Sequence, residues 1–417
     1  MFVFSKMEPG VLENSGRNVA PHILMVTHVI PYPPAAGNEI RIFNMLKWFR
    51  RKEYRVTLVV RPLGNEEVSN ESVIGLHKFV DDLYVFDARA KPDSSAEMIG
   101  SRVLDPDFQN DRVAELQNGF CPPWFVSDVA NLIQQKRPDV LLAEYVVMSR
   151  VLNVPEATGC LKVIDSIELF CRLKVTLEKF GLVNYGLDLS DEEEKLLLER
   201  ADIILAIQHL EYSEIQKLVP DRRALVTGFD LDIRSGEEQH NVAGRVLIIG
   251  SENEFNVRGT QDFIDYTWPL ILEQYPSATL HVVGRVSRCV HTNDPSVSLL
   301  GFVDSLESEY DQASVVVNPC RVGTGLKIKT VEALACGKPH VGWPASSDGL
   351  RELGELPYVV AGDAVDFADA IGEFLSDPGK CRNYGAKAQK FISSHFGAEV
   401  VYGPLSAAIE EHVSSRH

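Results

Sequence analysis

Residues 322–339 read VGTGLKIKTVEALACGKP, and this stretch places glycines, lysines and a carboxylate where one strand passes into one helix. The run from Ser314 to Asn318 before it has the composition of a buried strand, and the residues from Leu326 onward have the apolar spacing of a helix. Backbone N–H groups at the start of a helix attract anions. The stretch therefore predicts an α/β domain that holds a phosphorylated ligand at this junction.

Three side chains of this stretch have an expected role at such a site. Lys327 and Lys329 can add positive charge at the helix start, and Glu332 lies further along the helix, where it can accept hydrogen bonds from sugar hydroxyls. Gly337 is expected to end the helix. The alternative is an ordinary strand-to-helix turn with solvated lysines, because Gly-x-Gly patterns recur in many α/β folds.

The whole stretch resembles the donor-site signature of retaining glycosyltransferases of family 4 (glycosyl transferases group 1), which have the GT-B fold. In that family a glycine-rich turn is followed by a helix whose glutamate holds the nucleotide ribose, and Glu332 with the trailing sequence ALACGKP matches that helix. The family's paired-glutamate motif has an earlier glutamate eight positions upstream, where this chain has a threonine. The resemblance implies that the donor is bound by Gly323, Thr324, Gly325, Leu326, Lys327 and Glu332.

The composition limits the class of protein. A chain of 417 residues is too long for one ordinary core, so two domains, or three, are expected. The formal net charge of −18 argues against nucleic acid as the main partner. The seven cysteines are scattered without a Cys-x-x-Cys pair, which fits a reducing cytoplasm. No apolar run reaches the roughly 18 residues typical of a transmembrane helix.

The first half of the chain predicts a doubly wound parallel sheet. The nearly continuous apolar run from His22 to Ile30 has the pattern of a strand buried on both faces. A loop with proline and glycine, a helix from about Glu39 to Arg51 and a strand from Arg55 to Val60 complete a βαβ unit. Further strands are expected at residues 82–86, 140–144, 162–164 and 203–207, with helices such as 123–136 and 191–200.

The strand-helix pattern restarts in the second half, with a strand at 245–249, a helix at 260–274, and strands at 279–283 and 296–300. We expect the domain boundary in the polar stretch between Gly228 and Gly244. The fold class predicted is α/β, with two Rossmann-like domains facing a cleft, and the resemblance implies that a C-terminal helix crosses back to the first domain. The expected division is an N-terminal tail (1–20), an acceptor domain (21–228), a nucleotide-sugar donor domain (229–395) and the C-terminal helix (396–417).

Other strand ends of the second domain carry further candidate donor-binding residues. A polar loop is expected at 250–259, and the resemblance implies that Arg258 in it contacts the donor diphosphate, the alternative being a solvated loop arginine. Arg258 and Lys327 are the expected catalytic cations, which stabilise the leaving diphosphate. Arg285 follows the next strand. The resemblance also implies that the nucleotide base is received around Phe302 and Val303, although the Phe302 side chain could simply pack against its strand end.

In the first domain, Gly37 and Asn38 lie where the family has a glycine-rich loop near the donor phosphates, although a plain turn is an alternative. Many family members carry a His-Asp pair after a first-domain strand, whereas this chain offers Asp165 and Glu168. Either carboxylate could orient or deprotonate an acceptor hydroxyl as a catalytic group, or could be a helix cap or a structural ion pair. Glu144, at another strand end, is a candidate for binding the acceptor.

Neither a cofactor nor a metal ion is expected, since lysine and arginine can neutralise a diphosphate instead. The segment from Arg41 to Arg55 is basic and amphipathic, so it could contact a membrane surface. Its apolar residues would equally suit a helix that covers the sheet.

The expected function is transfer of a sugar from a nucleotide diphosphate sugar to a hydroxyl acceptor, with retention of anomeric configuration and without a metal. The acceptor could be a glycan, a glycolipid or a small molecule, and the family suggests cytoplasmic polysaccharide or glycolipid assembly, with or without membrane association. Two other classes stay open. A non-catalytic relative that binds a nucleotide sugar would fit Thr324 and the absent His-Asp pair, and a UDP-sugar epimerase would need additional acid and base residues.

Overall fold

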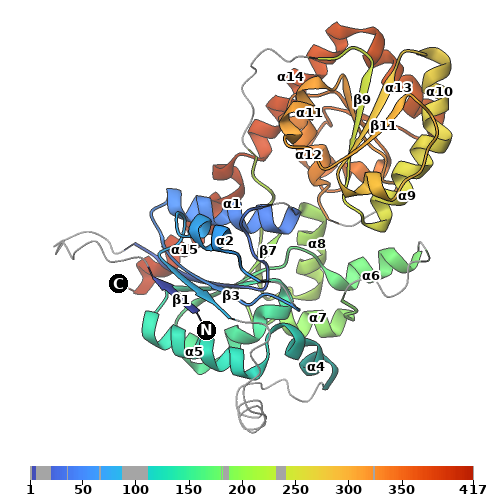
Figure 1. Cartoon of the computed structure of the whole chain (residues 1–417). Helices are drawn as coiled ribbons and strands as arrows, with labels where there is room; N and C mark the ends of the chain where they lie inside the picture. Colours follow the sequence, from blue (N-terminus) through green and yellow to red (C-terminus); the bar gives the residue numbers. More distant parts are fainter. Residues whose placement is uncertain are drawn as a thin grey trace. The chain divides into compact units, whose positions relative to one another are not determined.

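The computed structural model describes residues 2–5, 20–34, 36–64, 67–86, 111–179, 181, 187–231, 241–322 and 325–416. The chain divides into two compact units, one comprising Met1–Gly228 with Tyr402–His417 and the other comprising Phe229–Val401 (Figure 1). The first unit ends at the residue where the sequence pattern places the start of the boundary region. Each unit has its own sheet with helices packed around it.

The sheet of the first unit has strand order β1-β4-β3-β2-β5-β6-β7-β8 in the described part of the chain. All neighbouring pairs are parallel except β1 with β4. The strands are β1 (Phe2–Ser5), β2 (His22–Thr27), β3 (Arg55–Val60), β4 (Asp82–Val85), β5 (Val140–Glu144), β6 (Leu161–Asp165), β7 (Ile203–Ala206) and β8 (Arg223–Val226).

One expectation about this unit was wrong. Residues 2–5 are not part of a loose tail, because they form β1 and pair with β4 in the register Val3 opposite Tyr84. The sequence FVFS consists mainly of strand-forming residues, and the open edge of β4 offers backbone groups to pair with. The rest of the predicted tail up to residue 19, and residues 87–110, lie outside the described part.

Helices cover this sheet. They are α1 (Gly37–Arg51), α2 (Asn70–Leu76), α4 (Asp111–Phe120), α5 (Pro123–Lys136), the 3-10 segments η1 (Val146–Asn153) and η2 (Pro155–Ala157), α6 (Phe170–Lys179), α7 (Asp191–Leu198), α8 (His209–Leu218) and most of α15 (Ala398–Arg416).

Helix α1 packs its apolar side chains into the core of the first unit. Ile42, Met45, Leu46 and Phe49 have no exposed surface. The Trp48 ring lies 5.8 Å from the Tyr402 ring of α15, and its Nε1 donates a 2.9 Å hydrogen bond to Ser406 Oγ. These apolar side chains are therefore part of the core that covers the sheet, which is the second of the two interpretations of this segment.

The second unit has a parallel sheet with the order β11-β10-β9-β12-β13-β14. Its strands are β9 (Arg245–Ile249), β10 (Thr279–Val283), β11 (Val297–Gly301), β12 (Val315–Asn318), β13 (His340–Gly342) and β14 (Val359–Val360). Its helices are α9 (Glu254–Asp262), the π segment η3 (Phe263–Thr267), α10 (Trp268–Gln274), α11 (Leu306–Gln312), α12 (Ile328–Ala335), α13 (Ala364–Ser376) and α14 (Pro378–His395), with short 3-10 segments η4 (Arg285–Arg288), η5 (Pro344–Ser347) and η6 (Arg351–Leu353).

Aromatic side chains form the centre of the second core. The Phe367 ring lies 4.9 Å from the Trp343 ring and 5.5 Å from the Phe263 ring. Trp268 packs in the same cluster, together with apolar residues of β9, β10 and β12. This core fixes the strands whose ends carry the candidate donor-binding residues.

Candidate functional site

The candidate donor-binding residues of the second unit lie at one edge of its sheet. They follow the carboxyl ends of the four neighbouring strands β11, β10, β9 and β12. In parallel α/β sheets, ligands bind beyond this edge. The residues are Phe302 and Val303 after β11, Arg285 after β10, Arg258 after β9, and Gly325 to Glu332 after β12.

The junction between β12 and α12 has the expected strand-turn-helix arrangement. Gly325 has a φ of +69°, a left-handed conformation that glycine adopts without strain. Lys327 is the N-cap residue of α12, and its Nζ donates a 3.0 Å hydrogen bond to the Gly325 carbonyl. The Leu326 side chain is buried, so only its backbone can face a ligand. Gly323 and Thr324 lie outside the described residues.

Glu332 is held in a defined orientation on α12. Its Oε2 accepts a 2.8 Å hydrogen bond from Lys329 Nζ and a 3.1 Å hydrogen bond from the Tyr310 hydroxyl. Two hydrogen bonds to one oxygen hold the side chain in a single orientation. Lys329 is therefore an ion-pair partner of Glu332 as well as a charge near the helix start. Nothing in the sequence motif marks Tyr310, which comes from α11.

The predicted end of this helix at Gly337 is confirmed. Gly337 has a φ of +65°, and its N–H donates to the Leu334 carbonyl while the Lys338 N–H donates to the Ala333 carbonyl, both at 3.0 Å. This pair of bonds is a Schellman motif, which commonly ends a helix at a glycine.

Arg258 is exposed as expected but does not lie in a loop. The predicted polar loop at 250–259 was wrong, because α9 begins at Glu254, six residues before the predicted helix start. The Asn253 side chain caps the helix by accepting a 2.9 Å hydrogen bond from the Asn256 N–H, a signal that the sequence contained. A Cβ at Gly259 would lie 2.6 Å from the Pro319 carbonyl, so this helix passes very close to the end of β12.

Phe302 presents its ring to solvent between two arginines. Its side chain is 63% exposed, and the Arg285 and Arg288 guanidinium carbons lie 5.5 Å and 5.6 Å from its ring centroid. The ring therefore does not pack into the strand end, which was the alternative reading. Val303 is half-buried against a small core cluster with Tyr310. Arg285 Nη1 also lies 3.5 Å from Glu252 Oε1.

The candidate residues of the first unit lie at the carboxyl ends of β2, β5 and β6, which are neighbours in its sheet. Gly37 and Asn38 begin α1, and the Asn38 side chain is hydrogen-bonded to the Tyr145 hydroxyl. Tyr145 directly follows β5 with a φ of +65°, and its ring centroid lies 5.0 Å from that of His28. Tyr145 thus joins this group, although its sequence context gives no indication of it.

Asp165 forms a buried ion pair with Arg41. Arg41 Nε and Nη2 each donate a 2.7 Å hydrogen bond to one carboxylate oxygen of Asp165, and Arg41 also donates to the Gly228 carbonyl. The side chains of the pair are 1% and 0% exposed. This geometry matches the structural ion pair that sequence reasoning left open for Asp165, and it assigns Arg41 to the interior rather than to a membrane-facing surface.

Glu144 lies opposite Asp165 in the β5–β6 register and is fully buried. Burial raises the pKa of the Glu144 carboxyl well above its usual value, the negative charge of Asp165 raises it further, and Arg41 partly opposes both effects. A raised pKa favours the protonated carboxyl, and neither Glu144 side-chain oxygen has a hydrogen-bond partner among the described residues. The Glu144 side chain has no exposed surface in this structure, and its contact with an acceptor stays a prediction.

Glu168 is half-buried and thus more accessible than Asp165. It follows Ile167, which has a φ of +56° and turns the chain at the end of β6. The charge of Glu168 acts on Glu211, in the first turn of α8. Burial, and after it the charge of Glu168, raises the pKa of Glu211 to about 8. Glu211 was not anticipated from the sequence.

The described residues contain no cluster of metal ligands and no helix that could span a membrane. No three His, Cys, Asp or Glu side chains among them are grouped as metal ligands. None of the helices built from them is sufficiently long and apolar to span a bilayer.

Comparison with known proteins places these features in context. Residues 243–377 match the model of the family described as glycosyl transferases group 1. A stretch of 126 residues is 32% identical to an exopolysaccharide phosphotransferase of Streptomyces coelicolor and covers 29% of this chain. The match spans only 13% of the length of that relative.

Several solved structures share the fold over nearly the whole chain. The Anabaena protein HepE in complex with UDP and glucose has a TM-score of 0.59 at 14% identity, covering 94% of this chain and 100% of its own. TarM has a TM-score of 0.68 at 10% identity, covering 94% of this chain and 99% of its own, and a Staphylococcus aureus TarM variant has been solved with UDP and alpha-GlcNAc-glycerol. The chain thus has two Rossmann-like parallel-sheet domains of the GT-B type, and its second unit carries a glycosyl transferases group 1 match.

Proposed function

We propose that this protein is a glycosyltransferase that moves a sugar from a nucleotide diphosphate sugar to a hydroxyl acceptor. The observation that carries the proposal is the carboxyl edge of the second sheet, where Arg258, Arg285 and Lys327 follow three neighbouring strands and Glu332 is oriented on α12. This edge lies within the stretch that matches glycosyl transferases group 1. HepE and TarM, which have the same fold, have been solved with UDP.

In the proposed mechanism the second unit binds the donor and stabilises the leaving group. Arg258, Lys327 and the start of α12 face the developing negative charge on the diphosphate, so their positive charge lowers the barrier to bond cleavage. Glu332 accepts hydrogen bonds from the ribose hydroxyls with the oxygen lone pairs that Lys329 and Tyr310 do not use. The exposed face of Phe302 packs against the nucleotide base.

The first unit supplies the acceptor side in this proposal. Asn38 and Glu168 are two of the polar groups that lie at its carboxyl edge without being fully buried. Glu168 accepts a hydrogen bond from the acceptor hydroxyl and orients it. Asp165 and Glu144 act through Arg41 by fixing the backbone around them, so they are positioning residues.

We further propose that transfer retains the anomeric configuration, needs no metal ion, and uses a hexose donor. The acceptor is a glycan, a glycolipid or a small molecule, and the reaction takes place in the cytoplasm as a step in polysaccharide assembly. Product analysis by NMR tests retention, and activity in the presence of EDTA tests metal independence. Inversion of the anomeric carbon, or complete loss of activity with EDTA that Mg²⁺ restores, would overturn the respective part.

The donor site is tested by a thermal-shift screen of the protein against UDP, GDP, ADP and their common sugar conjugates, because a ligand of the folded state raises its apparent stability. We expect a shift selective for one base. Loss of charge-assisted bonds should weaken that ligand about 10- to 100-fold in Lys327→Ala and Glu332→Ala variants. The matched control is Lys390→Ala, which removes an exposed cation from α14 outside this edge. Unchanged affinity in both site variants would overturn the assignment.

One alternative has support in specific residues. The ion pair between Arg41 and Asp165 occupies a strand end where many family members have a His-Asp pair, so the protein could bind a nucleotide sugar without turning it over. Donor binding without product formation across a panel of hydroxyl acceptors would favour this non-catalytic function over transfer.

A further inference from the structure

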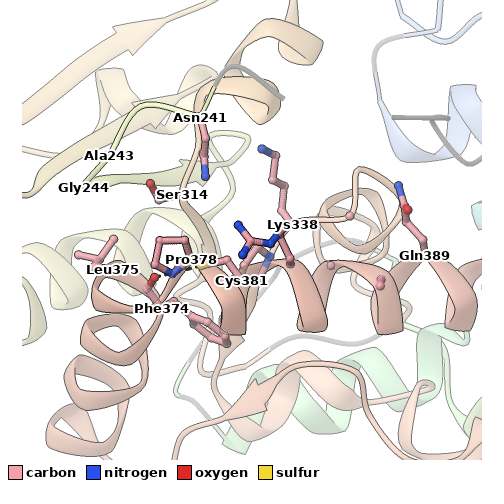
Figure 2. Close-up of a pocket in the computed structure, with 15 residues that line it drawn as sticks. Asn241, Ala243, Gly244, Ser314, Lys338, Phe374, Leu375, Pro378, Cys381 and Gln389 are labelled. Atoms are coloured by element: carbon pink, nitrogen blue, oxygen red, sulfur yellow. Dashed lines mark hydrogen bonds between the residues drawn. The ribbon is translucent and has the colours of Figure 1, made fainter. Parts of the chain in front are cut away.

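A separate pocket lies at the opposite edge of the second sheet (Figure 2). Three of its lining residues, Gly244, Ser314 and Pro339, directly precede the strands β9, β12 and β13. The pocket therefore borders the amino ends of these strands, whereas the candidate donor residues follow the carboxyl ends. With a rise of about 3.3 Å per residue, a five-residue strand separates the two edges by roughly 15–20 Å.

The volume of the pocket is about 630 Å³, within the usual range of small-molecule sites. Its remaining wall is formed by the end of α13 and the first half of α14, including Phe374, Pro378 and Cys381. Figure 2 shows Lys338 between Asn241, next to β9, and Gln389 on α14. Residues far apart in the sequence thus build one concave surface within a single unit.

The described lining of this pocket carries positive charge, whereas the whole protein has a negative net charge. Among the described residues, the lining includes two cations, Lys338 and Arg382, and no aspartate or glutamate. The chain as a whole has 59 acidic residues and a formal net charge of −18. Asn241, Ser314 and Gln389 add neutral hydrogen-bonding groups. Such a lining favours an anion and disfavours a cation.

Lys338 is held in place before any ligand arrives. Its side chain is 1% exposed, and its Nζ donates hydrogen bonds of 3.0 Å and 3.1 Å to the carbonyls of Asp311 and Ala313 at the end of α11. Burial lowers the pKa of Lys338 to about 8. Burial removes water from the Lys338 ammonium. An anion bound close to it would compensate for that lost hydration and would stabilise the charged form of the lysine.

The backbone around the pocket is closely packed. A Cβ at Gly385 of α14 would lie only 2.3 Å from the Gly337 carbonyl, so the helix and the residue before Lys338 are in direct backbone contact. Gly337 itself closes α12 through the Schellman motif described above. Close packing of this kind fixes the distance between the two walls, as expected of a preformed site.

We propose that this pocket is a second ligand site, which binds a small molecule carrying a phosphate group. Lys338 and Arg382 supply the two positive charges that a phosphate dianion requires. Because the pocket and the candidate donor residues border opposite edges of the sheet, this proposal does not depend on the proposed transferase activity.

The test uses the full chain and three probes: inorganic phosphate, glucose 6-phosphate and AMP. Calorimetry measures their binding, and hydrogen exchange locates it. We expect at least one probe to slow amide exchange in residues 337–341 and 381–389. Binding of inorganic phosphate alone would show that the free anion is sufficient for binding. Tighter binding of glucose 6-phosphate or AMP would show that the pocket recognises a phosphate on an organic carrier. Both results support the site.

The variant that tests the site is Arg382→Glu, which reverses an exposed charge and so leaves folding intact. We expect it to weaken binding at least tenfold, while Lys390→Glu on the same helix, outside the pocket lining, leaves binding unchanged. Lys327→Ala, at the other edge, should leave the protection of residues 337–341 and 381–389 unchanged. Equal affinity in Arg382→Glu and the unmodified protein, protection confined to residues 325–335, or no binding of any probe would overturn the proposal.

Discussion

At the scale of single residues, the group formed by Arg41, Asp165 and Glu144 controls the edge of the first sheet. The two carboxyls and the guanidinium lie together in the interior and have almost no exposed surface. The raised pKa of Glu144 favours its protonated form, in which the group is neutral overall, and a neutral group costs less to keep away from water. The group connects α1, β5 and β6, and so holds three of the elements that carry the acceptor-side candidates.

Replacing Arg41 should strongly destabilise the first unit. Arg41→Met removes the partner of Asp165 and leaves a buried carboxylate unpaired, so we expect the free energy of unfolding to fall by about 3–5 kcal/mol. Chemical denaturation followed by circular dichroism measures this. Arg50→Met, at an exposed position on the same helix, should cost less than about 1 kcal/mol. Similar losses in the two variants would show that the buried pair contributes little.

Glu211 should make stability depend on pH. Its folded pKa of about 8 lies above the ordinary value of 4.5, so between these values the folded state binds more protons than the unfolded state. Stability from this group is therefore complete below about pH 4.5 and is lost as the pH rises through 8.

We thus expect the melting temperature of the unmodified protein to fall more between pH 6 and 9 than that of Glu211→Gln. A shift of about 2–4 °C per kcal/mol makes this difference measurable by differential scanning fluorimetry. Glu192→Gln, an exposed carboxyl on α7, is the control and should follow the unmodified protein. Parallel pH curves for the unmodified protein and Glu211→Gln would contradict a raised pKa at Glu211.

At the scale of elements, strands were predictable where a long apolar run marks them. The strands at 55–60, 140–144, 245–249 and 279–283 have the predicted bounds, because continuous apolar runs mark them. The short strands β8, β13 and β14 were not predicted, since two to four residues give too little periodicity. Helix α9 was predicted to start too late because its first turns are polar, and only the Asn253 cap marks them.

The candidate functional site was only partly predictable from the sequence, because sequence patterns record neighbouring residues. A motif within one segment, such as Gly325 to Gly337, can be read from neighbouring residues. Partners that meet through the fold cannot, and this applies to Tyr310 with Glu332, Arg41 with Asp165, and Glu168 with Glu211. These pairs are separated by between 22 and 124 positions, and no local pattern records them.

The contact between α12 and α14 gives an element-scale prediction. In Gly385→Ala the added Cβ would meet the Gly337 carbonyl, so α14 must shift, and we expect a loss of about 2 kcal/mol or more in the stability of the second unit. Gly119→Ala, on α4, adds a Cβ in open space and should be neutral or stabilising by up to about 1 kcal/mol. Urea denaturation measures both variants, and a neutral Gly385→Ala would show that the helix contact can relax.

At the scale of the whole molecule, the chain passes between the two units twice, after Gly228 and after Val401. The second passage lies within α15, so residues 402–417 complete the first unit. Tyr402, Leu405 and Ile409 are fully buried there. The Tyr54 hydroxyl also donates a 2.9 Å hydrogen bond to Glu410 Oε1. The predicted return of the final helix to the first domain is thus seen in these contacts, although the helix begins at Ala398 in the second unit.

Removing residues 402–417 should therefore destabilise the first unit and leave the second unchanged. Exposing three buried apolar side chains costs roughly 5 kcal/mol or more. Hydrogen exchange followed by mass spectrometry reports each unit separately, so faster exchange in β2, β3 and α1 with unaltered exchange in β9 to β13 is the expected result. A control that removes only 414–417 should show little change, and equal loss of protection in both units would contradict this division.

The return of α15 to the first unit also affects how the protein is made. On the ribosome, the strands of the first sheet are complete when Val226 has been added, yet Tyr402 and Ser406, which cover Trp48, follow only after Phe229–Val401 has been synthesised. At 5–20 residues per second this interval lasts on the order of 10–35 s. During that interval the nascent first unit exposes an aromatic surface on α1, a surface of the kind that chaperones bind. The second unit can fold without such a delay, because its described strands come from one uninterrupted segment.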